Sequence, residues 1–190
     1  MKSKFKFLQI FVLLTLTACS GGGGGGEGSS ESTSTTGVRI MHGGIDSAPM
    51  ELTSAGDSKV LQTAIYAESK GYAPVGTGQK TITVTPKGSA GPVFSQGFAI
   101  DKNQGFSILV FGERGGSGVR SALIDETPTI TDQTSVKFVN GLIGSSFIRV
   151  RVGTNTVSDP IGIGTSSEYI PLQSDVINFT VFNSSGGVVH

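Results

Sequence analysis

The sequence predicts an all-β fold, a sandwich of short antiparallel strands, from three observations. Apolar and polar residues alternate with period two in several short segments, the pattern of strands with one buried face. Glycine, proline and asparagine separate these segments at short intervals, which predicts tight turns. Only 15% of the residues are charged and 29 of the 190 are glycine, a composition that suits sheet with many turns.

The strands can be placed in order along the chain. Three segments alternate cleanly: 81–85, 148–152 and 177–181. Segment 106–111 is apolar on both faces, which predicts a central strand covered on both sides. The best helical candidate is 57–69, although its β-branched and aromatic residues suit a strand as well. Because no long amphipathic helix is predicted, the strands are expected to pack as a sandwich.

The first 18 residues predict an export signal rather than part of the fold. Three lysines precede ten mostly apolar residues at 7–16, about half the length that a membrane-spanning helix needs. The leader ends in Leu16-Thr17-Ala18-Cys19, which resembles the lipobox of bacterial lipoproteins. The resemblance implies cleavage after Ala18 and a lipid on Cys19. Since Ser20 follows the cysteine rather than the aspartate of inner-membrane lipoproteins, it also implies the outer membrane.

Residues 19–37 are predicted to form a flexible, lipid-anchored Gly/Ser linker. Residues 20–37 contain no apolar side chain, and a flexible chain of this length spans about 20–25 Å on average. Cys19 is the only cysteine, so an internal disulfide is excluded. Without the three leader lysines, 11 basic residues remain against 14 acidic ones. This balance, with no basic run, argues against a nucleic-acid partner.

An internal repeat divides the folded part into 38–133 and 134–190. Residues 38–52 align without gaps with 136–150, and 81–84 align with 178–181 after a shift of one residue. Nothing in the second copy corresponds to 94–126. The sequence therefore predicts one immunoglobulin-like antiparallel sandwich followed by a partial second repeat. It leaves open how the partial copy completes its core.

The opening of the first copy resembles a known family. Val38-Arg-Ile-Met-His42, then Asp46, then Ala48-Pro-Met-Glu-Leu52 is similar to the start of the family called domain of unknown function 4397. The later blocks 72–75, 81–84, 106–112 and 119–126 resemble the rest of that family, and 136–185 resembles it more weakly. Two departures are Gly43-Gly-Ile45 in place of Ala-Ser-Pro and the loss of two polar residues from the second copy. The resemblance implies an extracytoplasmic β-sandwich, often repeated and lipid-anchored, without assigned catalytic residues or cofactor.

His42 and Asp46 form the only polar pair near a predicted turn, and they are the candidate ligand contacts. The alternative is that His42 caps a strand end and Asp46 makes an Asx-turn, which the second copy favours because Asn140 and Gly144 occupy these positions. No cluster has the spacing of a metal site, so neither metal nor cofactor is expected. The glycine-rich segment 112–118 lacks the ending of a phosphate loop and predicts a hairpin.

We therefore expect a non-enzymatic lipoprotein of the cell envelope, with no catalytic residues, that binds a glycan or an envelope protein through its loops. One alternative is an enzyme acting on envelope polysaccharide or peptidoglycan. It needs two carboxylates about 5–9.5 Å apart, for which the candidates are Asp46, Glu51, Asp125 and Glu126. Another alternative is a self-associating architectural protein of the cell surface.

Overall fold

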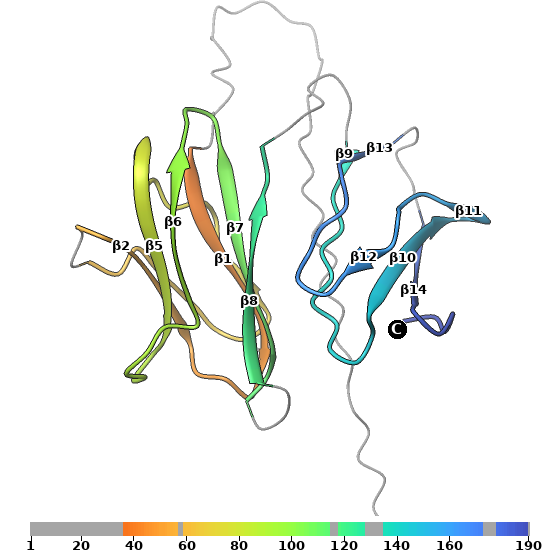
Figure 1. Cartoon of the computed structure of the whole chain (residues 1–190), viewed down its shortest axis with the longest axis horizontal. Coiled ribbons are helices and arrows are strands. Elements are labelled where there is room, and N and C mark those ends of the chain that lie inside the picture. Colours follow the sequence, from red (N-terminus) through yellow and green to blue (C-terminus); the bar gives the residue numbers. More distant parts are fainter. Residues whose placement is uncertain (1–35, 57–58, 115–117, 128–134, 173–177, 190) are drawn as a thin grey trace, which may run out of the picture. The chain divides into compact units, whose positions relative to one another are not determined.

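The computed structural model describes residues 36–56, 59–114, 118–127, 135–172 and 178–189 (Figure 1). These residues form strands and no helix, which confirms the predicted all-β class. None of them belongs to a helix long and apolar enough to span a membrane. The predicted export signal, Cys19 and all but the end of the predicted linker lie outside the described residues. The contacts divide the chain into two compact units, here called the N-terminal unit (36–127) and the C-terminal unit (135–189).

The first sheet of the N-terminal unit has the strand order β4-β1-β7-β8. Its strands are β1 (Gly37–Ile45), β4 (Glu68–Ser69), β7 (Gly105–Glu113) and β8 (Gly118–Asp125). β7 lies between β1 and β8 and is buried from Gly105 to Gly112, which confirms the covered central strand. β1 and β7 pair in parallel, whereas the sequence predicts antiparallel pairing throughout. All strands of the second sheet lie between β1 and β7 in the sequence. Such a long crossover connection allows the two strands to pair in parallel.

The second sheet has the order β3-β2-β5-β6, with antiparallel neighbours. Its strands are β2 (Met50–Ser54), β3 (Gln62–Ala64), β5 (Gly78–Pro86) and β6 (Phe94–Ile100). The predicted strand 81–85 lies within β5. The helical candidate 57–69 contains β3 and β4 instead of a helix in its described part, because strand pairing outweighs its weak helical periodicity.

The two sheets face each other as a sandwich, with a core of alternate residues from both (Figure 1). The first sheet contributes Val38, Ile40, Phe106, Ile108 and Val110, and the second contributes Met50, Leu52, Ile82, Val84, Phe94 and Ile100. Burying each of these large side chains stabilises the fold by about 1.5–3 kcal/mol. The predicted hairpin joins β7 to β8, with Glu113 opposite Gly118. Gly112 has a φ of 104°, and a Cβ there would lie 2.3 Å from the Gly118 carbonyl oxygen, so only glycine fits.

The C-terminal unit has its own sheets and core. β10 (Phe147–Val152) pairs with three strands, namely β11 (Asn155–Thr156), β12 (Ile161–Gly162) and β14 (Phe179–Asn183). β9 (Ser135–Val136) pairs with β13 (Ile170–Pro171). The core consists of Val136, Phe138, Ile148, Val150, Ile161, Val181 and Val189. The predicted strand 148–152 lies in β10, and the described part of 177–181 leads into β14.

Strand pairing follows the same register in the two units. Leu52 lies opposite Val84 in the N-terminal unit, and Val150 lies opposite Val181 in the C-terminal unit. Met50 lies opposite Ala64, and Ile148 lies opposite Ile161. Further along, the Lys70 N–H donates to the Ile40 carbonyl at 3.0 Å, and the Ser167 N–H donates to the Phe138 carbonyl at 2.8 Å. These pairs define equivalent positions in the two units. Equivalent residues differ by 98 in number up to Leu52 and Val150, and by 97 from Ala64 and Ile161 onward.

Candidate functional site

The first predicted contact, His42, is a fully buried residue of β1. Its Nδ1 accepts a hydrogen bond from the Gly44 N–H at 3.1 Å, so this nitrogen holds a lone pair. Nε2 lies 3.1 Å from the Ala48 carbonyl oxygen and therefore carries the proton. Both ring nitrogens thus hold the turn that follows β1. Burial lowers the pKa of His42, and the hydrogen bond to Ala48 opposes this only in part.

His42 is not arranged as a general base. Ser47 Oγ lies 3.3 Å from Nε2, but it donates its own proton to the Gly44 carbonyl at 2.8 Å. The ring nitrogen nearest the hydroxyl is the protonated one, so it has no lone pair with which to remove a proton from serine. A serine nucleophile needs the opposite tautomer.

Asp46, the second predicted contact, lies apart from His42. It is exposed in the turn after β1, with a φ of 55°. The equivalent residue Gly144 also has a positive φ, 96°. At the position of His42 the C-terminal unit has Asn140, whose Oδ1 accepts from the Leu142 N–H and whose Nδ2 donates to the Ile161 carbonyl, each at 2.9 Å. His42 and Asn140 both accept from the N–H two residues further along, which shapes the turn in each unit. Their second hydrogen bonds differ, because His42 bonds the Ala48 carbonyl of the same turn and Asn140 donates to Ile161 on β12.

The first sheet separates Asp46 from two of the other candidate carboxylates, Asp125 and Glu126. Glu51 lies on β2, in the second sheet. Asp125 ends β8 and Glu126 follows it, with the Glu126 N–H donating to the Gly105 carbonyl at the start of β7. Asp46 follows the far end of β1, whose start pairs with Gly105. Nine residues of strand, roughly 30 Å, separate these two ends.

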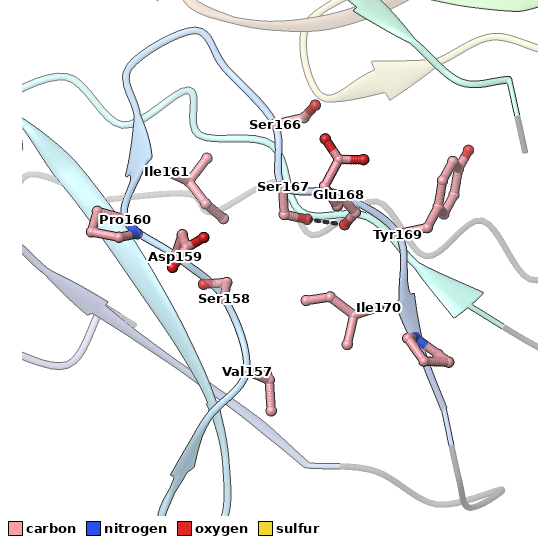
Figure 2. Close-up of a pocket in the computed structure, with 11 residues that line it drawn as sticks. Val157, Ser158, Asp159, Pro160, Ile161, Ser166, Ser167, Glu168, Tyr169 and Ile170 are labelled. Carbon is pink, nitrogen blue, oxygen red and sulfur yellow. Dashed lines mark hydrogen bonds between the residues drawn. The ribbon is translucent and has the colours of Figure 1, made fainter. Parts of the chain in front are cut away.

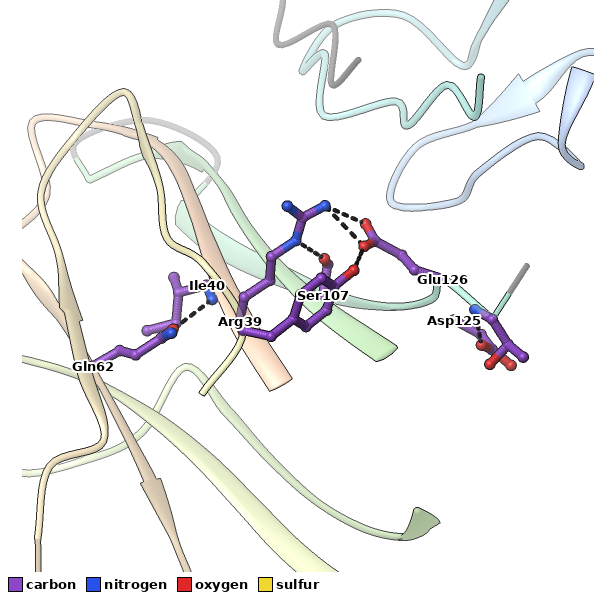
Figure 3. Close-up of polar contacts among 8 residues, drawn as sticks. Arg39, Ile40, Gln62, Ser107, Asp125 and Glu126 are labelled. Atoms are coloured by element: carbon purple, nitrogen blue, oxygen red, sulfur yellow. Dashed lines mark hydrogen bonds and ion pairs between the residues drawn. The ribbon is translucent and has the colours of Figure 1, made fainter. Parts of the chain in front are cut away.

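Glu126 belongs to a buried polar cluster that the sequence does not predict (Figure 3). Arg39 Nη2 donates to both carboxylate oxygens at 2.9 and 2.8 Å, and Arg39 Nε donates to Ser107 Oγ at 2.7 Å. Tyr72 donates its hydroxyl to Glu126, and its ring centroid lies 4.8 Å from the Arg39 guanidinium. The two charged side chains are only 11% and 4% exposed. Because each group already has a partner inside the protein, the cluster holds β1, β7 and the end of β8 together.

A cavity of about 440 Å³ lies within the C-terminal unit and is here called the C-terminal groove (Figure 2). Two segments line it, 157–161 and 166–171. The side chains of Ile161 and Ile170 point into the space between the segments. Asp159 and Glu168 are exposed at its rim, one on each segment. Neither carboxylate has a hydrogen-bond or ion-pair partner among the described residues, so both are available to a ligand.

The N-terminal unit differs at the corresponding place. Two residues before Ala64 lies Gln62, whose Oε1 accepts from the Ile40 N–H at 3.2 Å (Figure 3). Its Nε2 donates to the Gly71 carbonyl. The amide therefore links the two segments of that unit.

In the C-terminal unit Glu168 is the equivalent of Gly71, whereas Gln62 has no one-to-one equivalent. Leu61 and Val157 are equivalent, because they donate their N–H groups to the equivalent carbonyls of Leu52 and Val150. Two residues separate Leu61 from Ala64, whereas three, 158–160, separate Val157 from Ile161. The Phe138 N–H, which corresponds to that of Ile40, is satisfied by Ser167 Oγ at 3.0 Å. Asp159, in the longer segment, makes no link like that of Gln62 among the described residues.

No group of three or more histidine, cysteine or acidic residues is placed to hold a metal ion within the described ranges. The groove offers two carboxylates and several hydroxyls, and the neutral His42 ring has no lone pair beyond the one that accepts from Gly44.

A two-sheet sandwich, in which buried polar side chains hold strands and turns in place, defines the described part of the chain as an all-β module. More specifically, the sequence profile of the family described as Domain of unknown function (DUF4397) matches residues 36–146, and the chain belongs to this family. The match covers the described N-terminal unit and continues into the start of the C-terminal unit. No curated protein matches the chain.

Proposed function

We propose that the protein is a non-enzymatic binding lipoprotein of the bacterial cell envelope, which captures a glycan or an envelope protein in the C-terminal groove. The observation that carries this proposal is the groove itself, where two carboxylates without protein partners flank an apolar floor. Its volume, about 440 Å³, lies within the range of about 300–1,000 Å³ typical of ligand pockets.

Within the ranges that the structure describes, no catalytic group is seen to assemble, which supports binding over catalysis. His42 Nε2 carries its proton and so offers no base, and Asp46 lies at the opposite end of the first sheet from Asp125 and Glu126, so it forms no acid pair with them. An envelope substrate whose specific turnover disappears in a folded His42→Ala variant would contradict this part of the proposal.

The anchor is proposed from the sequence. Cys19 at the end of a lipobox, followed by a linker without apolar residues, supports a lipid-held module that stands off the outer membrane. Cell fractionation tests this directly. We expect the wild-type chain in outer-membrane fractions and the Cys19→Ser chain in soluble fractions. The matched control is Ser20→Asp, which keeps the cysteine and is expected to move the protein to the inner membrane. Membrane association of Cys19→Ser would refute the anchor.

Binding is tested separately, by screening the purified chain against envelope glycans and envelope proteins. We expect a ligand whose binding is lost when Asp159 and Glu168 are replaced by Asn and Gln. Ligand binding that survives this double replacement would place the site elsewhere.

A further inference from the structure

We infer that the outer face of the β10–β14 pair binds an acidic polysaccharide, through arginine side chains that recognise its carboxylate groups. This face consists of Phe147, Arg149 and Arg151 on β10 and of Thr180 and Phe182 on β14, and is here called the arginine face. None of these residues lines the C-terminal groove, so the inference adds a second binding surface to the proposed function.

Strand geometry places the five side chains on one side of the sheet. Ile148, Val150 and Val181 point into the core of the C-terminal unit. The residues of the arginine face are their neighbours along the two strands and therefore point to the opposite side. The register sets Arg149 directly opposite Phe182. Both arginines are exposed and the other three residues are half-buried, so a ligand can reach the whole face.

Both guanidinium groups are held in place while their hydrogen-bond donors stay unused. The guanidinium carbon of Arg149 lies 4.8 Å from the centroid of the Phe147 ring, and that of Arg151 lies 4.5 Å from the centroid of the Phe182 ring. A cation–π contact positions the group but offers no lone pair to its N–H donors. Neither arginine has an ion-pair or hydrogen-bond partner among the described residues. Two positioned donor groups are therefore open to acceptors from a ligand.

The N-terminal unit shows that the fold does not require this face. Its register sets Glu51 opposite Thr85, which makes these residues equivalent to Arg149 and Phe182. The same pair of strands thus carries an acid and a threonine in one unit, and a cation and an aromatic ring in the other. Since the strand pairing is the same, the arginines and rings are explained by what the face contacts and not by folding.

The chemistry of the face favours a polysaccharide with regularly spaced carboxylates. The planar guanidinium matches a carboxylate with two parallel hydrogen bonds. Arg149 and Arg151 are two residues apart on one strand, so their Cα atoms lie about 7 Å apart. A chain of uronic acids carries one carboxylate on each sugar and can offer acids to both arginines, while the C–H groups of its rings contact Phe147 and Phe182. Two cations without a basic run suit a nucleic acid less well.

Isothermal titration calorimetry of the purified chain tests the inference with a defined probe, hexagalacturonate. Its methyl ester is the control ligand, because it keeps the sugars and removes the charges. We expect the acid to bind, the ester not to bind, and binding of the acid to weaken as salt rises. A second arm uses vesicles of phosphatidylglycerol, which offer an anionic membrane in place of a glycan.

The variants locate the site. Arg149→Gln and Arg151→Gln are each expected to weaken binding roughly 2- to 5-fold, and together more strongly. Replacing both arginines by lysine keeps the charge but removes the planar donor group, so we expect an affinity between those of wild type and the double glutamine variant. Arg120→Gln, which changes an exposed arginine of β8, is the matched control and is expected to have no effect. Circular dichroism confirms that each variant keeps its sheet content.

The outcomes separate this inference from the proposed function. Binding of hexagalacturonate that the Arg149 and Arg151 variants weaken and Arg120→Gln does not supports the inference. Absence of binding, binding of the vesicles alone, or equal binding by wild type and the double glutamine variant overturns it. Binding that is lost on replacing Asp159 and Glu168, and kept in the double glutamine variant, places the glycan in the C-terminal groove. That last result overturns the inference and leaves the proposed function standing.

Discussion

The two units pair their strands in the same register, yet they differ in the space between two neighbouring segments. This space is bridged by a side chain between Gln62 and Gly71 in the N-terminal unit, and it is the groove between 157–161 and 166–171 in the C-terminal unit. In the N-terminal unit the Gln62 amide links the Ile40 N–H to the Gly71 carbonyl. In the C-terminal unit Asp159 makes no such link, Ser167 satisfies the Phe138 N–H, and the gap is a groove with acidic groups on both segments. The C-terminal unit thus has one residue more in this stretch and no linking amide, and a groove lies where the N-terminal unit is bridged, while the strand pairing stays the same.

The largest expected effect concerns the cation–aromatic pairs of the two units. Arg39 and Tyr72 share the buried carboxylate of Glu126, whereas the corresponding Lys137 and Tyr169 are half-buried. Glu126→Ala leaves the Arg39 charge unbalanced in a buried place, and we expect it to lower the free energy of unfolding by about 3–5 kcal/mol. Lys137→Ala removes a half-buried cation together with its cation–π contact to Tyr169, and is expected to cost about 1 kcal/mol or less. Urea denaturation followed by circular dichroism measures the free energy of unfolding of both variants. Equal losses in Glu126→Ala and Lys137→Ala would contradict the expected difference between the two units.

The next largest effect tests whether the role of His42 is structural or catalytic. His42→Ala removes both hydrogen bonds to the turn and leaves a buried gap, and we expect a loss of about 2–3 kcal/mol. His42→Asn introduces the residue that the C-terminal unit uses at this position, where Asn140 also accepts from the N–H two residues further along. We expect it to recover at least half of the loss in urea denaturation. A variant His42→Asn as unstable as His42→Ala would show that the two turns are not equivalent.

A smaller effect sharpens the comparison of the two gaps. Gln62→Ala leaves the N–H of buried Ile40 without its acceptor, and we expect a loss of about 1–2 kcal/mol in thermal unfolding. The reciprocal change, Asp159→Gln, alters an exposed residue and is expected to stay within about 0.5 kcal/mol of wild type. If Asp159→Gln proves as costly as Gln62→Ala, Asp159 has a structural role and the groove is not a free site.

The smallest effect is a dependence of stability on pH. Because burial lowers the pKa of His42 in the folded state, the unfolded chain binds this proton more readily. The contribution of His42 to stability is therefore complete above its ordinary pKa of about 6.5 and decreases as the pH falls below it. Melting temperatures between pH 8 and pH 5 should decrease more for wild type than for His42→Asn. Parallel curves for the two proteins would show that His42 does not titrate in this way.

The strand framework could be predicted from the sequence because alternation is a local property. Period-two patterns locate β5 and β10, and the doubly apolar segment 106–111 locates β7. The parallel pairing of β1 with β7 could not be predicted in this way, since it depends on how the chain crosses between sheets. The Arg39–Glu126 pair joins residues 87 positions apart, and no local pattern connects them.

The groove shows a different limit of prediction. Asp159 and Glu168 are separated in sequence and follow no catalytic or metal spacing. Their signal lies in the comparison of the two copies, where Glu168 occupies the position of Gly71 and the stretch that contains Asp159 is one residue longer than the stretch that contains Gln62. The place of the extra residue becomes clear only from the backbone pairing, which makes Leu61 equivalent to Val157 and Ala64 equivalent to Ile161.

The most direct test of the central claim is a map of amide chemical shifts in the purified, ¹⁵N-labelled chain during titration with the envelope glycan or protein that the binding screen identifies. The account predicts shifts concentrated in segments 157–161 and 166–171, and no comparable shifts around Gln62 and Gly71. Shifts confined to the N-terminal unit would contradict it.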